Sequence, residues 1–197
     1  MTKEQVQTIG NFLSTYYTDL NYIQMFQDFK SNKISTDNYI KKDTGTFYSF
    51  LIEFRVVRNF SQGSVDKLLE ETLRWVKSNN ADNVDLFAEK LAITNFTHGK
   101  VMTSLASKIL FLNNPWKIIP MDTLARKTLQ QKENKYAVYE KNLKAYRQIN
   151  RLIINSCVQY SKPLTSIIDR EYRSKLKNLN IICENRIVDK LLWTSGK

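Results

Sequence analysis

Residues that turn a chain are scarce in this sequence, which has five Gly and three Pro among 197 residues. An all-β chain needs a turn about every ten residues, so this scarcity argues against a fold of many short strands. Long apolar runs are also missing, and none approaches the roughly eighteen residues of a membrane-spanning helix. The opening MTKEQVQTIGNF lacks the charged and apolar regions of a secretory signal. We therefore expect a cytoplasmic protein that spans no membrane.

The residue sets of most common catalytic and cofactor sites are absent as well. His98 is the only histidine, and no Ser or Cys near it lies in a nucleophile motif, so Ser-His-Asp or Cys-His chemistry is not expected. His98, Cys157 and Cys183 do not have the paired spacing of metal ligands, so we expect no metal. Neither a P-loop nor a GxGxxG motif is present, so no cofactor is expected.

The two cysteines lie in apolar stretches, Cys157 in INSCVQY and Cys183 in NIICEN. A disulfide between them is one interpretation. The favoured one is that each fills a small buried apolar position, as cysteines do in a reducing compartment. Whether the two residues lie near each other is left open.

Positive charge is what the sequence has in excess, and it lies in one half of the chain. The net charge is +11; residues 1–98 hold 11 Lys and Arg against 12 Asp and Glu, whereas residues 99–197 hold 19 against 7. A bias in composition acts along a whole chain and does not place the excess in one half. Concentrated positive charge attracts polyanions by neutralising phosphates and releasing counterions. Nucleic acid is therefore the expected partner, and a well-solvated surface is the alternative.

Apolar residues recur with helical spacing along nearly the whole chain. One stripe, formed by Phe12, Tyr16, Leu20, Ile23 and Phe26, predicts one or two helices over about residues 3–30. We predict an all-α fold with a single helical domain over residues 1–197. Further helices are expected over about residues 47–54, from an N-cap at Ser64 to residue 76, from residue 84, over 101–112, from Asp122, and over ENRIVDKLLW, where Ile187, Leu192 and Trp193 should be buried.

Two more helices are expected in the basic half, and each carries a row of cations. One runs from Lys135 to Tyr160 with Ile149 facing inward, and the next begins at Pro163 with Ile167 facing inward. Residues three or four apart share a helix face. The cations on these two faces are the main candidate nucleic-acid contacts, namely Lys141, Lys144, Arg147 and Arg151 on the first helix, and Arg170, Arg173 and Lys177 on the second. An ordinary solvated face is the alternative interpretation for each.

The best candidate for chemistry is Lys108 with Asp122, which flank the loop NNPWKIIP. Asp122 stands where this loop enters a helix, so its simplest role is an N-cap. A carboxylate held at a helix start is also suited to stabilise an oxocarbenium-like sugar or to activate water. A desolvated lysine is suited to attack the same carbon as an amine nucleophile. Around the loop, Lys100 and Lys117 are further candidate nucleic-acid contacts, and Trp116 is a candidate for stacking on a base.

The segment IIPMDTLAR, with LASKILFL before it, resembles the helix–hairpin–helix base-excision DNA glycosylases over about residues 97–130. In that family a helix leads through a loop to a Pro-x-Asp-Thr segment whose aspartate is catalytic. The resemblance implies a glycosylase-like helical fold, duplex DNA as the partner, and Asp122 as the match to that aspartate. The chain is also similar to a group of uncharacterised bacterial proteins, through Ser107, Lys108, Phe111, Pro115, Asp122, Asp189, Leu192 and Trp193.

Two functions follow from these observations. The first is a DNA-binding protein with a glycosylase-like fold that inspects a base or acts on one through Asp122; whether it is an enzyme is left open. The second is a non-catalytic helical interaction module, of a phage or mobile-element type, whose basic face docks an acidic protein. The oligomeric state is not predicted.

Overall fold

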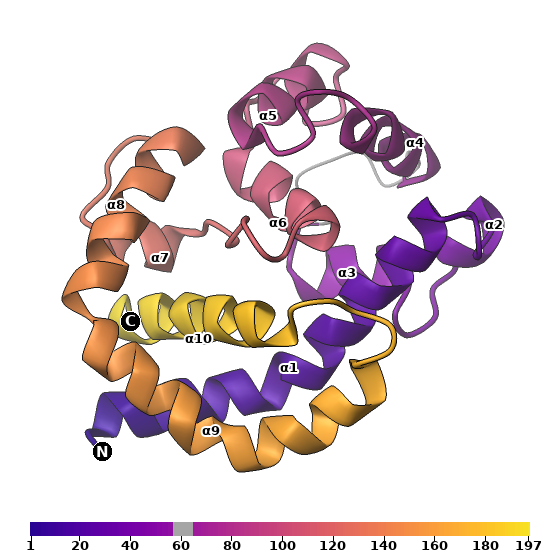
Figure 1. Cartoon of the computed structure of the whole chain (residues 1–197). Coiled ribbons are helices and arrows are strands. Elements are labelled where there is room, and N and C mark those ends of the chain that lie inside the picture. Colours follow the sequence, from indigo (N-terminus) through magenta and orange to yellow (C-terminus); the bar gives the residue numbers. More distant parts are fainter. Residues whose placement is uncertain (57–64) are drawn as a thin grey trace. The chain divides into compact units, whose positions relative to one another are not determined.

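The computed structural model describes residues 1–56 and 65–197, and within these ranges it contains helices and no strand (Figure 1). The predicted all-α class is therefore confirmed, whereas the N-cap expected at Ser64 lies outside the described residues. The helices are α1 (Lys3–Lys30), α2 (Thr36–Tyr39), α3 (Phe47–Glu53), α4 (Val65–Val76), α5 (Val84–Ile93), α6 (Thr103–Asn113), α7 (Thr123–Thr128), α8 (Tyr136–Ile149), α9 (Arg151–Tyr172) and α10 (Leu179–Ser195).

The chain divides into two compact units. Unit 1 consists of Met1–Leu20 and Ile119–Lys197, and unit 2 consists of Asn21–Ile118. Helix α1 contributes its first part to unit 1 and its second part to unit 2. Unit 1 holds 17 Lys and Arg against 9 Asp and Glu, and unit 2 holds 13 against 10. The positive excess therefore belongs mainly to unit 1, while the single-domain organisation stays a prediction.

Unit 2 is built around aromatic side chains and around a buried helix. Tyr39 of α2 stacks on Phe29 of α1 with 4.9 Å between ring centroids, and Phe50 and Phe54 lie 4.3 Å apart at the end of α3. Helix α6 packs against α5, and most of its side chains are buried because small and apolar residues cover its whole circumference. The predicted inward positions of α1 are confirmed, with Phe26 fully buried in this unit.

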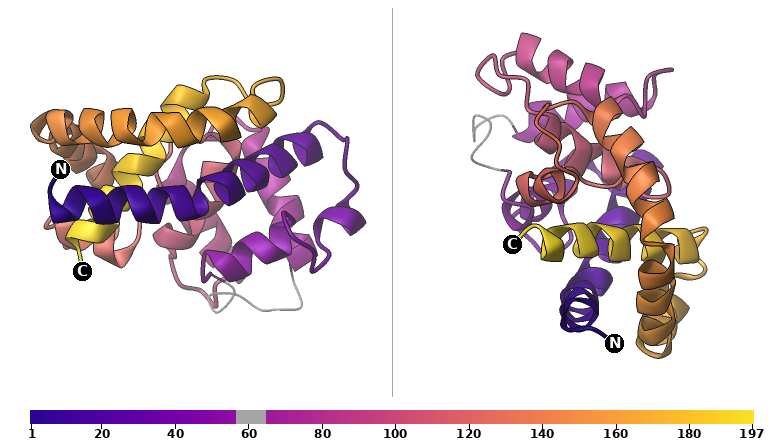
Figure 2. Two further views of the ribbon diagram at one scale, coloured as in Figure 1. Left: turned by 90° about the horizontal axis from the view of Figure 1, so that it is seen from below. Right: turned by 90° about the vertical axis from the view of Figure 1, so that its left-hand side faces the viewer.

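Unit 1 is organised by α10, which packs against both α7 and α9. Figure 2 shows α10 crossing α9 in both views. Ile187 and Leu192 are fully buried, as predicted. Trp193 was expected to be buried too, but it is only half-buried, with the Lys197 ammonium 3.4 Å from its ring centroid. Gly196 allows the end of α10 to approach the backbone of α7 closely, because a Cβ at this position would overlap the Leu124 carbonyl oxygen.

The predicted boundary between the two basic helices is wrong. The break falls at Asn150, with φ −96° and ψ 15°, and not at residues 161–163. The Asn150 side chain stabilises this break, since its Nδ2 donates to the Tyr146 carbonyl oxygen at 3.0 Å. Pro163 lies inside α9, although a proline in a helix interior costs about 3 kcal/mol. The helix continues because Cys157, Ser161, Thr165 and Tyr172 keep one buried face on both sides of the proline.

The inward positions predicted for these helices need correction as well. Ile149 is 82% exposed and Ile167 is 59% exposed. The break at Asn150 changes the register, so the buried face of α9 includes Ile154 and several small or polar side chains. Cys157 and Cys183 are both buried and neither forms a disulfide. Burial raises the pKa of the Cys183 thiol to about 12, as is typical of a structural and unreactive cysteine.

Candidate functional site

The residues predicted to form a site are divided between the two units. Lys100, Lys108, Trp116 and Lys117 belong to unit 2. Asp122 and the basic residues of the two C-terminal rows belong to unit 1. Lys108 and Asp122 thus belong to different units.

In unit 2 the predicted residues make structural contacts. Lys108 is half-buried on α6, and its Nζ donates to the Phe54 carbonyl oxygen at 3.0 Å, just after α3 ends. The Lys117 Nζ lies 3.2 Å from the Asp82 carboxylate, and Trp116 is half-buried in the adjacent turn. Lys100 is exposed in the turn between α5 and α6. The amine of Lys108 thus caps the end of α3. Sequence spacing did not indicate this hydrogen bond.

The backbone conformation of the turn between α5 and α6 explains why residue 99 is a glycine. Gly99 has φ +72° and follows His98 at φ +52°, both in the left-handed region where glycine is favoured. His98 is exposed in this turn, in agreement with a turn residue. Among the described residues, no group of three or more His, Cys, Asp and Glu is placed to hold a metal ion.

Asp122 caps α7, as its position between loop and helix predicted. Its Oδ1 accepts a hydrogen bond from the Ala125 backbone N–H at 2.7 Å, and the side chain is half-buried. Such a bond satisfies one of the helix's unpaired N–H groups, and the helix dipole favours the ionised carboxylate. The simpler of the two roles considered for Asp122 is therefore present, and it does not exclude the other.

Asp122 also acts electrostatically on a group of buried and half-buried ionisable side chains that the sequence patterns did not indicate. We call this group together with Asp122 the Arg186 cluster, and its members are Asp19, Asp122, Tyr139, Arg186, Asp189 and Lys190. Arg186 is 2% exposed, and its Nε lies 2.8 Å from Asp19 Oδ2 while its Nη1 lies 3.0 Å from Asp189 Oδ2. Two carboxylates hold this guanidinium because an unpaired buried charge is very costly.

Lys190 is the amine that Asp122 influences. Burial is the main cause that lowers the pKa of Lys190, and the nearby positive charge of Arg186 lowers it further; Asp189, Asp19 and Asp122 act in the opposite direction. Tyr139 donates to the Pro120 carbonyl oxygen at 3.2 Å, and burial raises its pKa well above the usual value. The spacing of Arg186, Asp189 and Lys190 in NRIVDK was the available signal, because charges at i, i+3 and i+4 interrupt an otherwise apolar helix.

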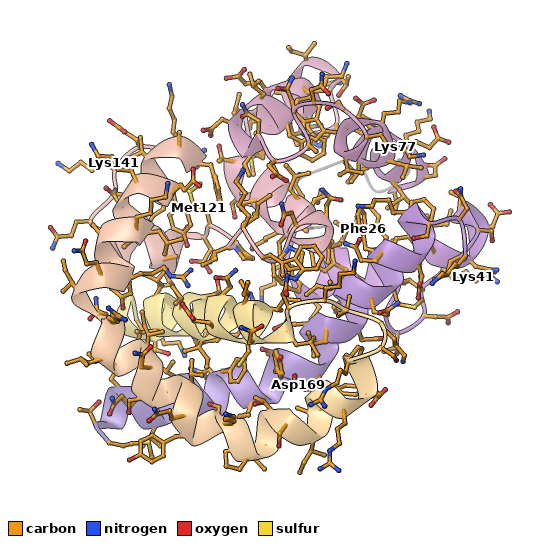
Figure 3. All side chains as sticks on the ribbon, in the orientation of Figure 1. Phe26, Lys41, Lys77, Met121, Lys141 and Asp169 are labelled. Carbon is orange, nitrogen blue, oxygen red and sulfur yellow. The ribbon has the colours of Figure 1, made fainter. Side chains whose placement is uncertain are left out.

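The first predicted basic row is only partly a free surface. Lys141 is exposed and extends outward from α8 (Figure 3). The Lys144 Nζ lies 3.9 Å from Glu140. Arg147 holds α8 to α10 instead, because it forms an ion pair with Glu184 and donates to Asn185 Oδ1 at 2.8 Å. Arg151 lies beyond the break at Asn150, at the start of α9, so the expected four-residue row on one helix is wrong.

The second predicted basic row is not a helix face either. Arg170 is exposed on α9, but α9 ends at Tyr172, so Lys177 lies in the connection to α10. Arg173 follows the last helical residue and acts electrostatically on Asp169. Burial raises the pKa of Asp169, which accepts a hydrogen bond from the Tyr16 hydroxyl at 2.9 Å (Figure 3). The three cations therefore lie at and beyond the C-terminal end of α9 and do not form a row along one face of the helix.

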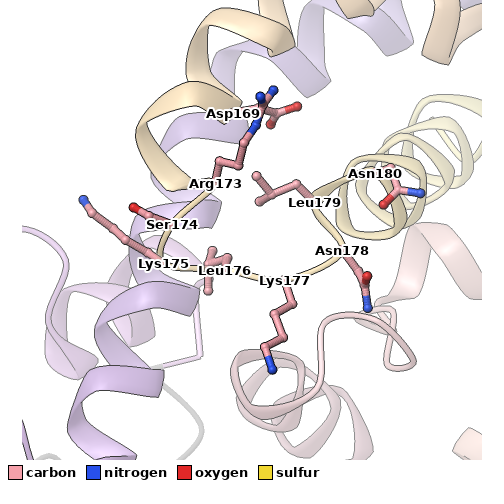
Figure 4. Close-up of a pocket in the computed structure, with 9 residues that line it drawn as sticks. All are labelled: Asp169, Arg173, Ser174, Lys175, Leu176, Lys177, Asn178, Leu179 and Asn180. Carbon is pink, nitrogen blue, oxygen red and sulfur yellow. The ribbon is translucent and has the colours of Figure 1, made fainter.

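The connection between α9 and α10 encloses a basic hollow of about 710 Å³, which we call the junction hollow. Figure 4 shows its lining, in which Arg173, Lys175 and Lys177 are accompanied by the carboxylate of Asp169 and by Asn178 and Asn180 at the start of α10. Asn178 adopts φ 50°, a left-handed conformation that asparagine tolerates. In the described part of the chain its side chain makes no capping hydrogen bond to α10. The N-terminus of a 17-residue helix therefore opens beside three cationic side chains.

Comparison with known proteins adds no further constraint. No family model matches the chain, and neither a curated protein nor a solved structure is similar to it. Over the two described ranges, none of the helices combines the length and apolar character needed to cross a membrane. The class that the fold defines is an all-α protein.

The capping role of Asp122 gives a direct prediction. Asp122→Asn should change the free energy of unfolding by only a few tenths of a kcal/mol, because asparagine caps a helix about as well as aspartate. Asp122→Ala removes the acceptor and should cost about 1 kcal/mol. Urea denaturation of both variants measures these differences. A loss above about 2 kcal/mol for Asp122→Asn would mean that the charge, and not the cap, is what the fold requires.

Proposed function

We propose that this protein binds duplex DNA through the basic surface of unit 1, with the junction hollow as a principal phosphate contact. The observation that carries this proposal is that Arg173, Lys175 and Lys177 line a hollow beside the N-terminus of α10, where Asn178 makes no side-chain cap. Helix N-termini present backbone N–H groups and a positive dipole end to anions. Cationic side chains beside them add charge-assisted contacts to phosphate oxygens.

The distribution of charge supports the same partner. Lys141, Arg151 and Arg170 are exposed, and none of them forms an ion pair within residues 1–56 and 65–197. Contacts of this kind go to the phosphate backbone, so they position the protein and carry little sequence information. The binding we propose is therefore strong at low salt and tolerant of sequence.

The resemblance over residues 97–130 extends the proposal to a base. The order of α6, a loop and α7 with Asp122 at its start agrees with the family's arrangement, and Asp122 is the candidate carboxylate for inspecting or releasing a base. Asp122→Asn should then abolish base release while leaving duplex affinity intact, because the amide cannot ionise. Lys108 is not expected to yield a borohydride-trapped adduct, since its amine already donates to the Phe54 carbonyl oxygen.

The test of DNA binding is the salt dependence of affinity for a labelled duplex. The logarithm of the binding constant should fall linearly with the logarithm of salt concentration. Replacing Arg173, Lys175 and Lys177 together by Ala should reduce the slope by up to about 2.7, at about 0.9 for each phosphate that the variant no longer neutralises. Lys41, Lys67 and Lys77 of unit 2 provide a charge-matched control, which should leave the slope nearly unchanged. Equal effects of the two triple variants, or no binding at low salt, would refute the proposal.

A second candidate function is the interaction module, and one observation favours it. Large apolar side chains are exposed along α9, and phosphate binding gives no reason for them. In this case the protein is not an enzyme, and its partner is a protein.

A further inference from the structure

Helix α9 carries an apolar face that the fold leaves uncovered. Together with the last residue of α8, this face holds five large side chains that are between 53% and 84% exposed, namely Ile149, Leu152, Tyr160, Leu164 and Ile167. We call it the α9 stripe. It is distinct from the buried face of the same helix, which includes Ile154, Cys157 and Ser161. Helix α9 therefore has two apolar faces, and the body of unit 1 uses one of them.

The spacing shows that these exposed side chains form one surface. The four members on α9, Leu152, Tyr160, Leu164 and Ile167, differ by eight, four and three positions, which keeps them on one side of a helix with about 3.6 residues per turn. Ile149 ends α8, just before the break at Asn150. Between Leu152 and Ile167 the stripe extends for about 22 Å at 1.5 Å per residue. Single exposed apolar residues need no explanation, but four large ones on one side of a single helix indicate an interaction site.

Charges beside the stripe indicate what covers it. Arg151, Lys162 and Arg170 are exposed on the same helix, and none of them forms an ion pair within the described ranges. The acidic residues of α9 are engaged with α1 instead: Asp169 accepts from Tyr16 at 2.9 Å, and Glu171 accepts from Tyr17 at 3.1 Å. The charge available around the stripe is therefore positive.

We propose that the α9 stripe docks an amphipathic helix of a partner protein, with apolar side chains on its contact face and Asp or Glu on its flanks. An apolar seam with charged flanks is the usual way in which two helices recognise each other. A second copy of this chain fits less well, because both copies would bring Arg151, Lys162 and Arg170 to the same seam. Duplex DNA offers the cations a partner but gives Leu152, Leu164 and Ile167 nothing apolar to contact. The inference does not depend on the DNA proposal.

A designed peptide provides the probe. It is a fluorescein-labelled helix of 21 residues, about six turns, with Leu at every third and fourth position and Glu on the flanks. The same helix with Lys in place of Glu is its matched control. Fluorescence anisotropy with the full chain should show binding of the Glu peptide, weakened by salt, and at least about tenfold weaker binding of the Lys peptide.

Variants of the protein locate the site. Leu152→Ser with Leu164→Ser should weaken binding of the Glu peptide at least about tenfold, as expected when anchor residues are removed. Ile52→Ser with Ile93→Ser removes two exposed apolar side chains from unit 2 and should have no effect. Because all four side chains are exposed, both double variants should keep the wild-type thermal melt.

Several results would overturn the inference. One is equal affinity for the two peptides, or unchanged binding by the Leu152→Ser, Leu164→Ser variant. Another is a wild-type dimer in sedimentation velocity that this variant converts to monomer, which would assign the stripe to a second copy. A third is loss of duplex DNA affinity in the same variant, which would make the stripe part of the DNA surface. Unchanged DNA affinity together with abolished peptide binding supports the inference and keeps the two proposals separate.

Discussion

Truncation after Asn185 is expected to unfold unit 1. The deleted segment contains Arg186, Ile187, Leu191 and Leu192, each 2% exposed or less. Burying one large apolar side chain contributes about 1.5–3 kcal/mol, and the whole stability of a domain is about 5–15 kcal/mol. The truncation also removes the Leu192 carbonyl oxygen that accepts the Thr128 hydroxyl at 2.6 Å and ties α10 to α7.

Circular dichroism and limited proteolysis measure this effect. The truncated chain should lose helical signal and become sensitive to proteases within residues 119–185. Deleting only Lys197 is the control, because that residue is exposed and should be dispensable. A truncated protein that melts like the full chain would show that the last part of α10 is an appendage.

Asp19→Ala is expected to cost about 3–5 kcal/mol, because it leaves the buried Arg186 guanidinium without one of its two carboxylates. The free energy of unfolding from urea denaturation measures the loss. Glu140→Ala is the control, since it removes an ion pair of similar type whose Lys144 partner is 77% exposed, and such pairs contribute about 0–1 kcal/mol.

A double variant separates the charge from the packing. Asp19→Ala combined with Arg186→Met removes the buried cation together with its partner, so it should recover part of the loss. The recovery of the free energy of unfolding should be incomplete, because Arg186→Met leaves the Asp189 carboxylate without its cationic partner and next to an apolar side chain. If Asp19→Ala alone costs less than about 1 kcal/mol, the buried ion pair is not the structural element that its geometry indicates.

Sequence patterns within a few residues predicted helices and caps that depend only on neighbouring residues. The five-residue stripe of α1 and the loop-to-helix position of Asp122 each specify a helix or a cap within a few residues, and both predictions are confirmed. The break at Asn150 could not be predicted in this way, because apolar spacing continues across it and asparagine is tolerated inside helices. Pro163 is a local signal for a helix boundary, but no boundary occurs there. Tertiary packing of α9 outweighs the local cost of the proline.

The candidate site was harder to predict because its contacts join distant positions. Arg186 and Asp19 are separated by 167 residues in sequence, and Arg147 and Glu184 by 37. No local spacing indicates that Arg147 is engaged with Glu184 or that Asp122 acts electrostatically on Lys190. The junction hollow likewise depends on where α9 ends, and the expected helix, which was predicted to carry Lys177, extended past that point.

Binding of duplex DNA by unit 1 at the junction hollow can be measured by hydrogen exchange with and without duplex. The backbone N–H groups of Leu179 and Asn180 at the start of α10 should exchange more slowly when DNA is bound, because phosphates cover that helix N-terminus. The connection over residues 173–178 should be protected in parallel, and protection should disappear at high salt. Saturating duplex that leaves these amides unchanged, or that protects only residues of unit 2, would contradict the account.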